Sequence, residues 1–129
     1  MEDLIARVTA TTGLDAGTAQ KAIGAVLNFL QKEGPPEEVG QLLEKIPGGA
    51  EAMAAAAADG GGGGGLMGAL GGLMGGGIMG LAGQLQGLGL GMGQIQTLGK
   101  ELFAYGREVA GEDTMGAIAG AIPGLSQFV

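Results

Sequence analysis

Glycine occupies 18 of the positions from residue 60 to residue 93, and no charged side chain lies between Asp59 and Lys100. Glycine lowers helix stability by roughly 1 kcal/mol relative to alanine, and dense glycine is typical of a flexible linker. The run Gly60–Gly65 fits a linker. Beyond it, apolar residues recur every three or four positions, the spacing of one helix face: Met67, Leu70, Met74, Ile78, Leu81, Leu85, Leu88, Met92 and Ile95. The sequence therefore predicts a linker followed by a helix or a helical hairpin.

Glycines form a second face of this predicted helix, because Gly68, Gly72, Gly76 and Gly80 are four residues apart. A strip of glycines lets another helix backbone approach closely. Seven glycines between residues 66 and 81 disfavour an isolated helix by roughly 7 kcal/mol against alanine, whereas each buried Leu or Met contributes roughly 1.5–3 kcal/mol. The helix therefore needs a partner. The residues predicted to make this contact are Gly68, Gly72, Gly76, Gly80, Leu70, Leu73, Met74 and Ile78.

Three partners fit the stretch: the flanking segments of its own chain, a second copy of the chain, or lipid. Burial within the protein or an oligomer is favoured, because glycine offers lipid little apolar surface and Gln84 and Gln86 interrupt the apolar run. Membrane insertion as a helix or hairpin is the alternative, and a disordered stretch is a third. Between Leu88 and Gly93 the residues alternate with glycine, which fits a tight turn between two helices as well as one continuous helix.

The composition of the 129 residues predicts an all-α protein: a small helical bundle, with the glycine-rich helix or hairpin at its centre. Residues 1–59 and 94–129 are helical segments around residues 60–93, and the three together form one folded unit. Few aromatic side chains are available to build a core, which favours a homo-oligomer. The net charge of −7 argues against nucleic acid, whose phosphates attract basic surfaces. No secretory signal opens the chain at Met1–Ile5, which predicts a cytoplasmic protein.

The flanking segments carry recognisable helix boundaries. Gly13 suits the end of a first helix, and Asp15 is a good N-cap for a second helix that Gly34 and Pro35 end. The remaining predicted helices run from Pro36 to Pro47, from Ala50 to Ala58, from Gln94 to Ala110, and from a cap at Asp113 to Pro123.

An internal repeat links the two flanking segments. Val39-Gly40 and Ile46-Pro47-Gly48 recur as Met115-Gly116 and Ile122-Pro123-Gly124, with a constant offset of 76 in residue number. Two explanations remain open: a duplicated unit, or convergence of two capped helices. A duplicated unit would give the bundle pseudo-two-fold symmetry around the glycine-rich helix.

The segment from Gly34 to Gly48, which reads GPPEEVGQLLEKIPG, resembles the Pro-Pro-Glu-Glu…Leu-Pro signature of small bacterial helical proteins classed as the domain of unknown function 2267. The resemblance covers residues 1–49 fairly well and residues 94–129 more weakly. It implies a small all-α bacterial domain without an assigned activity or site residues.

The residue types exclude several kinds of chemistry. The sequence has no His or Cys, so it lacks the bases and nucleophiles of Ser-His-Asp and Cys-His catalysis and the ligands of His or Cys metal sites. The only serine is Ser126, and Gly99-Lys100 lacks the following Ser or Thr of a phosphate loop. No catalytic, cofactor-binding or metal-binding residue is therefore predicted, and no small-molecule substrate is identified.

The remaining charged and methionine patterns have structural explanations. The acid pairs Glu37–Glu38 and Glu112–Asp113 suit the first turns of helices better than a calcium or acid–base site. A stripe of Met67, Met74, Met79 and Met92 is interpreted as core, with a partner-binding groove as the alternative. The sequence predicts a non-enzymatic structural or interaction protein that self-associates through its glycine-rich helix; a membrane-associated protein is the alternative.

Overall fold

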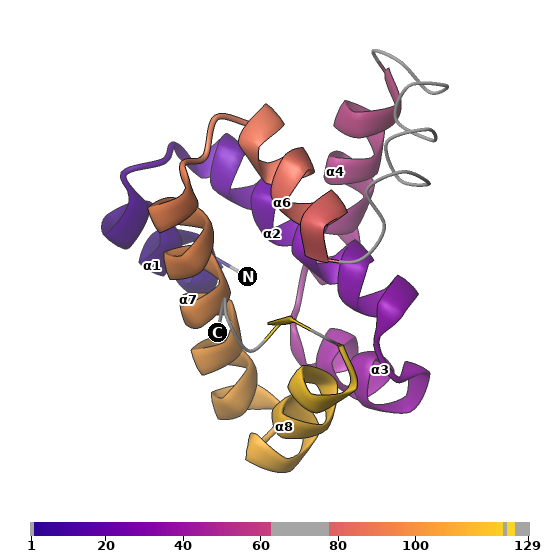
Figure 1. Cartoon of the computed structure of the whole chain (residues 1–129). Coiled ribbons are helices and arrows are strands. Elements are labelled where there is room, and N and C mark those ends of the chain that lie inside the picture. The colour runs from indigo at the N-terminus through magenta and orange to yellow at the C-terminus, as the bar shows by residue number, and fades with distance from the viewer. Residues whose placement is uncertain (1, 63–77, 123, 126–129) are drawn as a thin grey trace.

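The computed structural model describes residues 2–62, 78–122 and 124–125, with side chains outside 56–62 and 78–79. The described residues form seven helices, shown in Figure 1, and contain no strand, so the all-α prediction is confirmed. The helices are α1 (Glu2–Thr12), α2 (Ala16–Glu33), α3 (Pro36–Lys45), α4 (Gly49–Gly62), α6 (Ile78–Gly87), α7 (Met92–Val109) and α8 (Glu112–Ala121).

The boundaries of the first three helices follow from local sequence signals. Helix α1 ends before Gly13, whose φ of +76° favours glycine. The Asp15 side chain caps α2 by accepting a hydrogen bond from the Thr18 backbone N–H at 3.2 Å. Pro36 is the first residue of α3, where a missing N–H is harmless. These three predictions are confirmed.

Helix α4 is longer than predicted. It begins at Gly49 and continues through Asp59 into the glycine run as far as Gly62. The predicted stop at Ala58 and the linker beginning at Gly60 are therefore wrong. Helix α4 packs on α2, and such tertiary contact outweighs weak helix propensity.

The start of α8 also differs from its prediction. Helix α8 begins at Glu112, and Gly111, with φ of +99°, occupies the N-cap position. Asp113 therefore lies inside the first turn, and its predicted capping role is wrong. A carboxylate in the first turn still interacts favourably with the positive end of the helix dipole.

The described part of the glycine-rich segment is a helix followed by a turn. Helix α6 ends at Gly87, Gly89 has a φ of +101°, and α7 begins at Met92. Of the two alternatives for residues 88–93, a turn between two helices is therefore correct and one continuous helix is wrong. The predicted segment boundary after Gly93 falls inside α7. Met92 is 49% exposed, so its predicted place in the core is wrong. The predicted helix over residues 66–77 lies outside the described residues.

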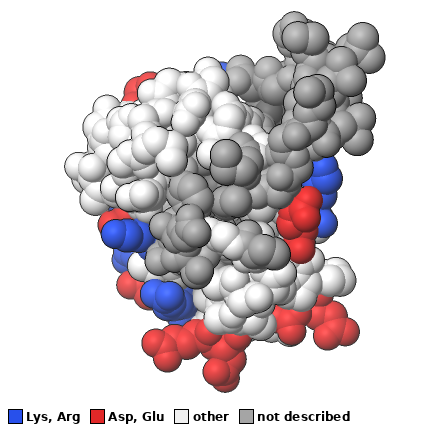
Figure 2. All heavy atoms as spheres, in the orientation of Figure 1, with Lys and Arg blue, Asp and Glu red and all other residues white. Residues whose placement is uncertain are grey.

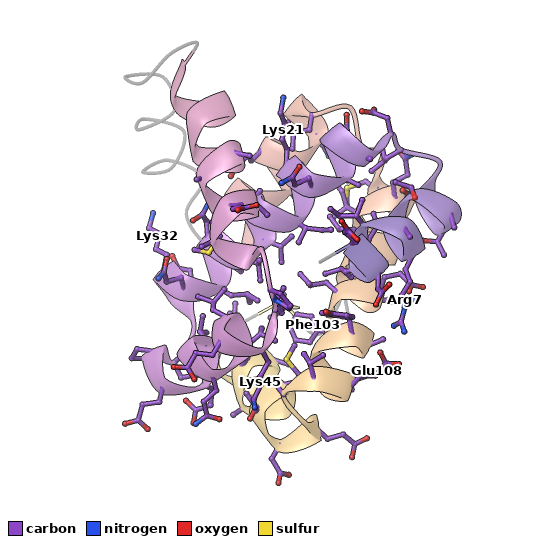
Figure 3. All side chains as sticks on the ribbon, turned by 180° about the vertical axis from the view of Figure 1, so that it is seen from behind. Arg7, Lys21, Lys32, Lys45, Phe103 and Glu108 are labelled. Carbon is purple, nitrogen blue, oxygen red and sulfur yellow. The ribbon has the colours of Figure 1, made fainter. Side chains whose placement is uncertain are left out.

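Helices α2 and α7 form the centre of the bundle. They pack on each other, with α1 against both, α4 beside α2 and α3 beside α8, as Figure 1 shows. Phe103 of α7 is almost fully buried, and Figure 3 places it inside the bundle. Around Phe103, the residues of α3, α7 and the turn after α3 that are buried in this core include Val39, Leu42, Ile46, Ile95, Leu98 and Leu102, while Leu43 is half-buried.

Candidate functional site

The predicted self-association residues fall mainly outside the described part of the chain. Gly68, Leu70, Gly72, Leu73, Met74 and Gly76 lie there. Ile78 is the first residue of α6, and Gly80, in the same helix, is half-buried. Within the described residues, this predicted surface therefore corresponds to α6.

Helix α6 has one buried face and one open glycine face. Leu81, Ala82 and Leu85 are buried, and the helix packs on α2 and α7. Gly83 and Gly87 are exposed, and a Cβ atom at either position would meet no described heavy atom within 4 Å. This pair leaves a strip of bare backbone on the outer side of α6.

Glycine supports a close helix contact at a different place, between α2 and α4. A Cβ atom at Gly24 would overlap the backbone carbonyl of Ala52 and would lie 3.0 Å from the Met53 nitrogen. The backbone of α4 therefore lies directly on α2. The Asn28 Nδ2 donates a hydrogen bond to the Met53 carbonyl at 3.0 Å, which fixes how far α4 is shifted along α2.

Sequence reasoning missed the Gly24 contact. Apolar residues recur along α2 at helical spacing, but that spacing assigns no role to a glycine. A signal was available, because glycine in the interior of a helix costs roughly 1 kcal/mol relative to alanine. An isolated glycine near the middle of an 18-residue helix therefore indicates a close neighbour.

Gly106 of α7 leaves room for the Met115 side chain of α8. A Cβ atom at Gly106 of α7 would lie 2.5 Å from the Met115 sulfur of α8 and 3.2 Å from Cδ1 of Leu42 in α3. The space that Gly106 leaves is thus filled by the fully buried Met115. At Gly24 and Gly106 the missing side chain thus makes room for a neighbouring helix, whereas a Cβ atom at Gly83 or Gly87 would meet no described atom within 4 Å.

Charged groups remain at the surface of the described residues, where no polar or charged side chain is buried. Arg7 of α1 and Glu108 of α7 form an exposed ion pair of 2.9 Å, and the Arg7 guanidinium lies 5.9 Å from the centre of the Tyr105 ring (Figure 3). Exposed pairs of this kind contribute about 0–1 kcal/mol. The Arg7–Glu108 pair therefore orients α1 on α7 more than it stabilises the fold.

Acidic side chains gather at the end of the molecule that α3 and α8 form (Figure 2). The pairs Glu37–Glu38 and Glu112–Asp113 occupy the first turns of these helices, in agreement with their predicted positions. In the described part of the chain, no group of three or more Asp or Glu side chains is arranged to hold a metal ion.

The hydrogen bonds that Asp15 makes at the start of α2 change the pKa of its carboxyl group. Its carboxylate accepts hydrogen bonds from the Thr18 hydroxyl at 2.8 Å and from the Thr18 backbone N–H. These two bonds stabilise the charged form and lower the pKa of Asp15 below its ordinary value of 3.8. This shift reflects helix capping at an exposed position.

Comparison of the chain with protein-family models, with curated proteins and with solved structures finds no match. The resemblance to the domain of unknown function 2267 gains no support from these comparisons and stays a prediction. Within residues 2–62 and 78–122, no helix is both long enough and apolar enough to cross a membrane.

Proposed function

We propose that this chain is a cytoplasmic, non-enzymatic scaffold or interaction protein that self-associates through its glycine-, leucine- and methionine-rich stretch. The observation that carries the proposal is the open glycine face of α6 at Gly83 and Gly87. These residues continue the glycine spacing of residues 68–80 into the described part of the chain. A second copy of the same face is the partner that the proposal assigns to it.

The contact at Gly24 supports this assignment, because it shows the packing that a bare helix backbone permits. Two backbones in close approach gain many small dispersion contacts, which no side chain holds apart. A face that meets its own copy across a two-fold axis is self-complementary. The stretch between Asp59 and Lys100 carries no charge, so the net negative charge of the chain lies away from the proposed contact.

The test replaces the open glycines of α6 in the full chain with Gly83→Leu and Gly87→Leu. A side chain fits at both positions of the single chain, because an added Cβ would meet no described atom within 4 Å. We expect an unchanged far-ultraviolet circular dichroism spectrum but a molar mass reduced to the 12.5 kDa of one chain, measured by light scattering. The substitutions Gly72→Leu and Gly76→Leu should have the same effect on mass.

The matched control is Gly116→Leu with Gly120→Leu in α8, where two glycines also lie four residues apart and open. We expect this control to assemble like the wild type. A wild-type protein that stays monomeric over a wide concentration range would refute self-association. A protein that sediments with membranes and is released only by detergent would instead support the alternative, insertion of the glycine-rich stretch into lipid.

A further inference from the structure

The helices of the two flanking segments have matching bounds. Ala16 and Met92 begin α2 and α7, Glu33 and Val109 end them, and the residue numbers of each pair differ by 76. Helices α3 and α8 are related by the same offset at both ends. The correspondence of helix bounds thus extends beyond the short motif at Val39–Gly48 to two consecutive helices.

The turns after the first and third helices follow the same offset, whereas Pro35 and Gly111, before the third helix of each set, differ, with φ of −66° and +99°. Gly13 and Gly89 both have positive φ, at +76° and +101°, after the first helix of each set. Gly48 and Gly124, after the third helix, both have φ of +83°. Only glycine adopts this backbone conformation without strain. The two sets of helices therefore change direction at corresponding glycines after their first and third helices.

The buried positions of the two central helices also correspond. Each buried residue of α7 matches, at this same offset, a buried residue of α2. The pairs are Ala19 and Ile95, Ala22 and Leu98, Ile23 and Gly99, Val26 and Leu102, Leu27 and Phe103, Phe29 and Tyr105, and Leu30 and Gly106. In α3 and α8, Val39 matches Met115 and Leu42 matches Ile118.

The two sets also differ at Gly24 of α2 and in the buried residues of their first helices. Gly24 is buried under α4, whereas its counterpart Lys100 is exposed and has no described helix in the place of α4. The buried Leu4 and Val8 of α1 correspond to Leu81 and Leu85 of α6 at an offset of 77. The buried positions of α6 are therefore shifted by one residue relative to those of α1.

We propose that α1–α2–α3 and α6–α7–α8 are two copies of one three-helix unit, and that two chains associate by exchanging these units. The partner is thus a second copy of this chain. The inference rests on the proposed self-association and names a second contact for it, separate from the glycine face of α6.

The helices of each unit pack against helices of the other unit. Helix α1 packs on α7, α6 packs on α2, and α3 packs on α8. Polar contacts also cross between the units: Gln94 Nε2 donates to the Thr12 carbonyl at 2.8 Å, and the Thr114 hydroxyl donates to Gln41 Oε1 at 3.3 Å. The apolar core lies between the units, so a unit separated from its counterpart would expose its buried face.

An exchanged pair of chains makes the same contacts as two closed chains. The units are joined by α4 and by residues 63–77. Since the contacts are identical, the balance between closed and exchanged forms depends on chain connectivity and on protein concentration. We therefore expect the exchanged form to increase with concentration.

The experiment uses Gln41→Cys together with Thr114→Cys in the full chain, which has no native cysteine. These substitutions place one thiol on each unit at a contact between them. The protein is unfolded and refolded at low and high concentration and then treated with a short bismaleimide. A link within one chain gives a 12.5 kDa band on a denaturing gel, whereas exchange gives a covalent dimer whose fraction rises with refolding concentration.

The single variants Gln41→Cys and Thr114→Cys are the controls, and neither should give a covalent dimer. Assembled protein whose links all lie within single chains would overturn the exchange but leave the proposed glycine contact intact. A covalent dimer that persists with Gly83→Leu and Gly87→Leu would support the exchange and reject that glycine contact. A protein that is monomeric at every concentration would overturn both.

Discussion

At the scale of single residues, Gly24 shows what a missing side chain does for two helices. Helix α4 contains few large side chains, and among its residues with described side chains, 49–55, the fully buried alanine is Ala52. Burial of small side chains gives little hydrophobic stabilisation, which scales with the apolar area removed from water. The contact therefore depends on the close approach of the two backbones, which only glycine at position 24 permits.

The substitution Gly24→Ala should destabilise the protein. Its Cβ would overlap the carbonyl of Ala52, and overpacking of this kind costs typically about 1–3 kcal/mol, more than the roughly 1 kcal/mol that alanine gains in helix propensity. Urea unfolding followed by circular dichroism measures the difference. The control Gly116→Ala, at an open position of α8 outside the proposed contact, should raise stability by about 0.5–1 kcal/mol. A Gly24→Ala protein as stable as the wild type would refute the close contact.

At the scale of helices, the N-terminus of α2 depends on the Asp15 carboxylate. The Thr18 hydroxyl and backbone N–H bond the charged form and lower the pKa of Asp15. A group with a lowered pKa in the folded state stabilises the fold above its unfolded pKa. That stabilisation is lost as the pH falls through the lower, folded value.

The substitution Asp15→Ala should therefore lower the melting temperature at neutral pH, because the cap is lost. The difference from the wild type should shrink as the pH falls below the ordinary pKa of 3.8, where the wild-type carboxyl also becomes protonated. Asp15→Asn, which keeps a cap without a charge, should stay closer to the wild type at neutral pH. A melting-temperature difference that is constant from neutral to acidic pH would contradict the role of the charge.

Helix boundaries with a local cause were predictable from the sequence. Gly13, Asp15 and Pro36 act on their own neighbours in the chain, and the structure has α1, α2 and α3 where these residues place them. The extension of α4 to Gly62 was not predictable in this way, because the low helix propensity of glycine predicts an earlier end. Met92 fits the apolar spacing but is exposed, because the turn before α7 separates it from the face of α6.

For the candidate site, the sequence predicts the type of contact but not which residues make it. A face of glycines at four-residue spacing indicates close backbone approach, and α6 has such a face at Gly83 and Gly87. Which glycines already have a neighbour depends on residues far along the chain. Gly24 contacts Ala52, and Gly106 contacts Met115 and Leu42; periodicity within one helix contains no information about these partners.

At the scale of the whole molecule, α2 and α7 join the two halves in one core. Leu27 of α2 and Phe103 of α7 are 0% and 1% exposed. Leu27→Ala should cost about 2–5 kcal/mol and Phe103→Ala about 3–5 kcal/mol. Calorimetry should show one cooperative transition for each variant, whereas independent halves would give two transitions of which each variant shifts one. Met92→Ala, at an exposed site, should change stability by less than about 0.5 kcal/mol.

The position of Tyr105 has a spectroscopic consequence. The sequence contains one tyrosine and no tryptophan, so nearly all near-ultraviolet absorbance and intrinsic emission come from a single ring. That ring is buried in α7 and lies beneath the Arg7 guanidinium of α1. The fluorescence and near-ultraviolet absorbance of Tyr105 therefore report on the contact between α1 and α7, and both should change when these helices separate.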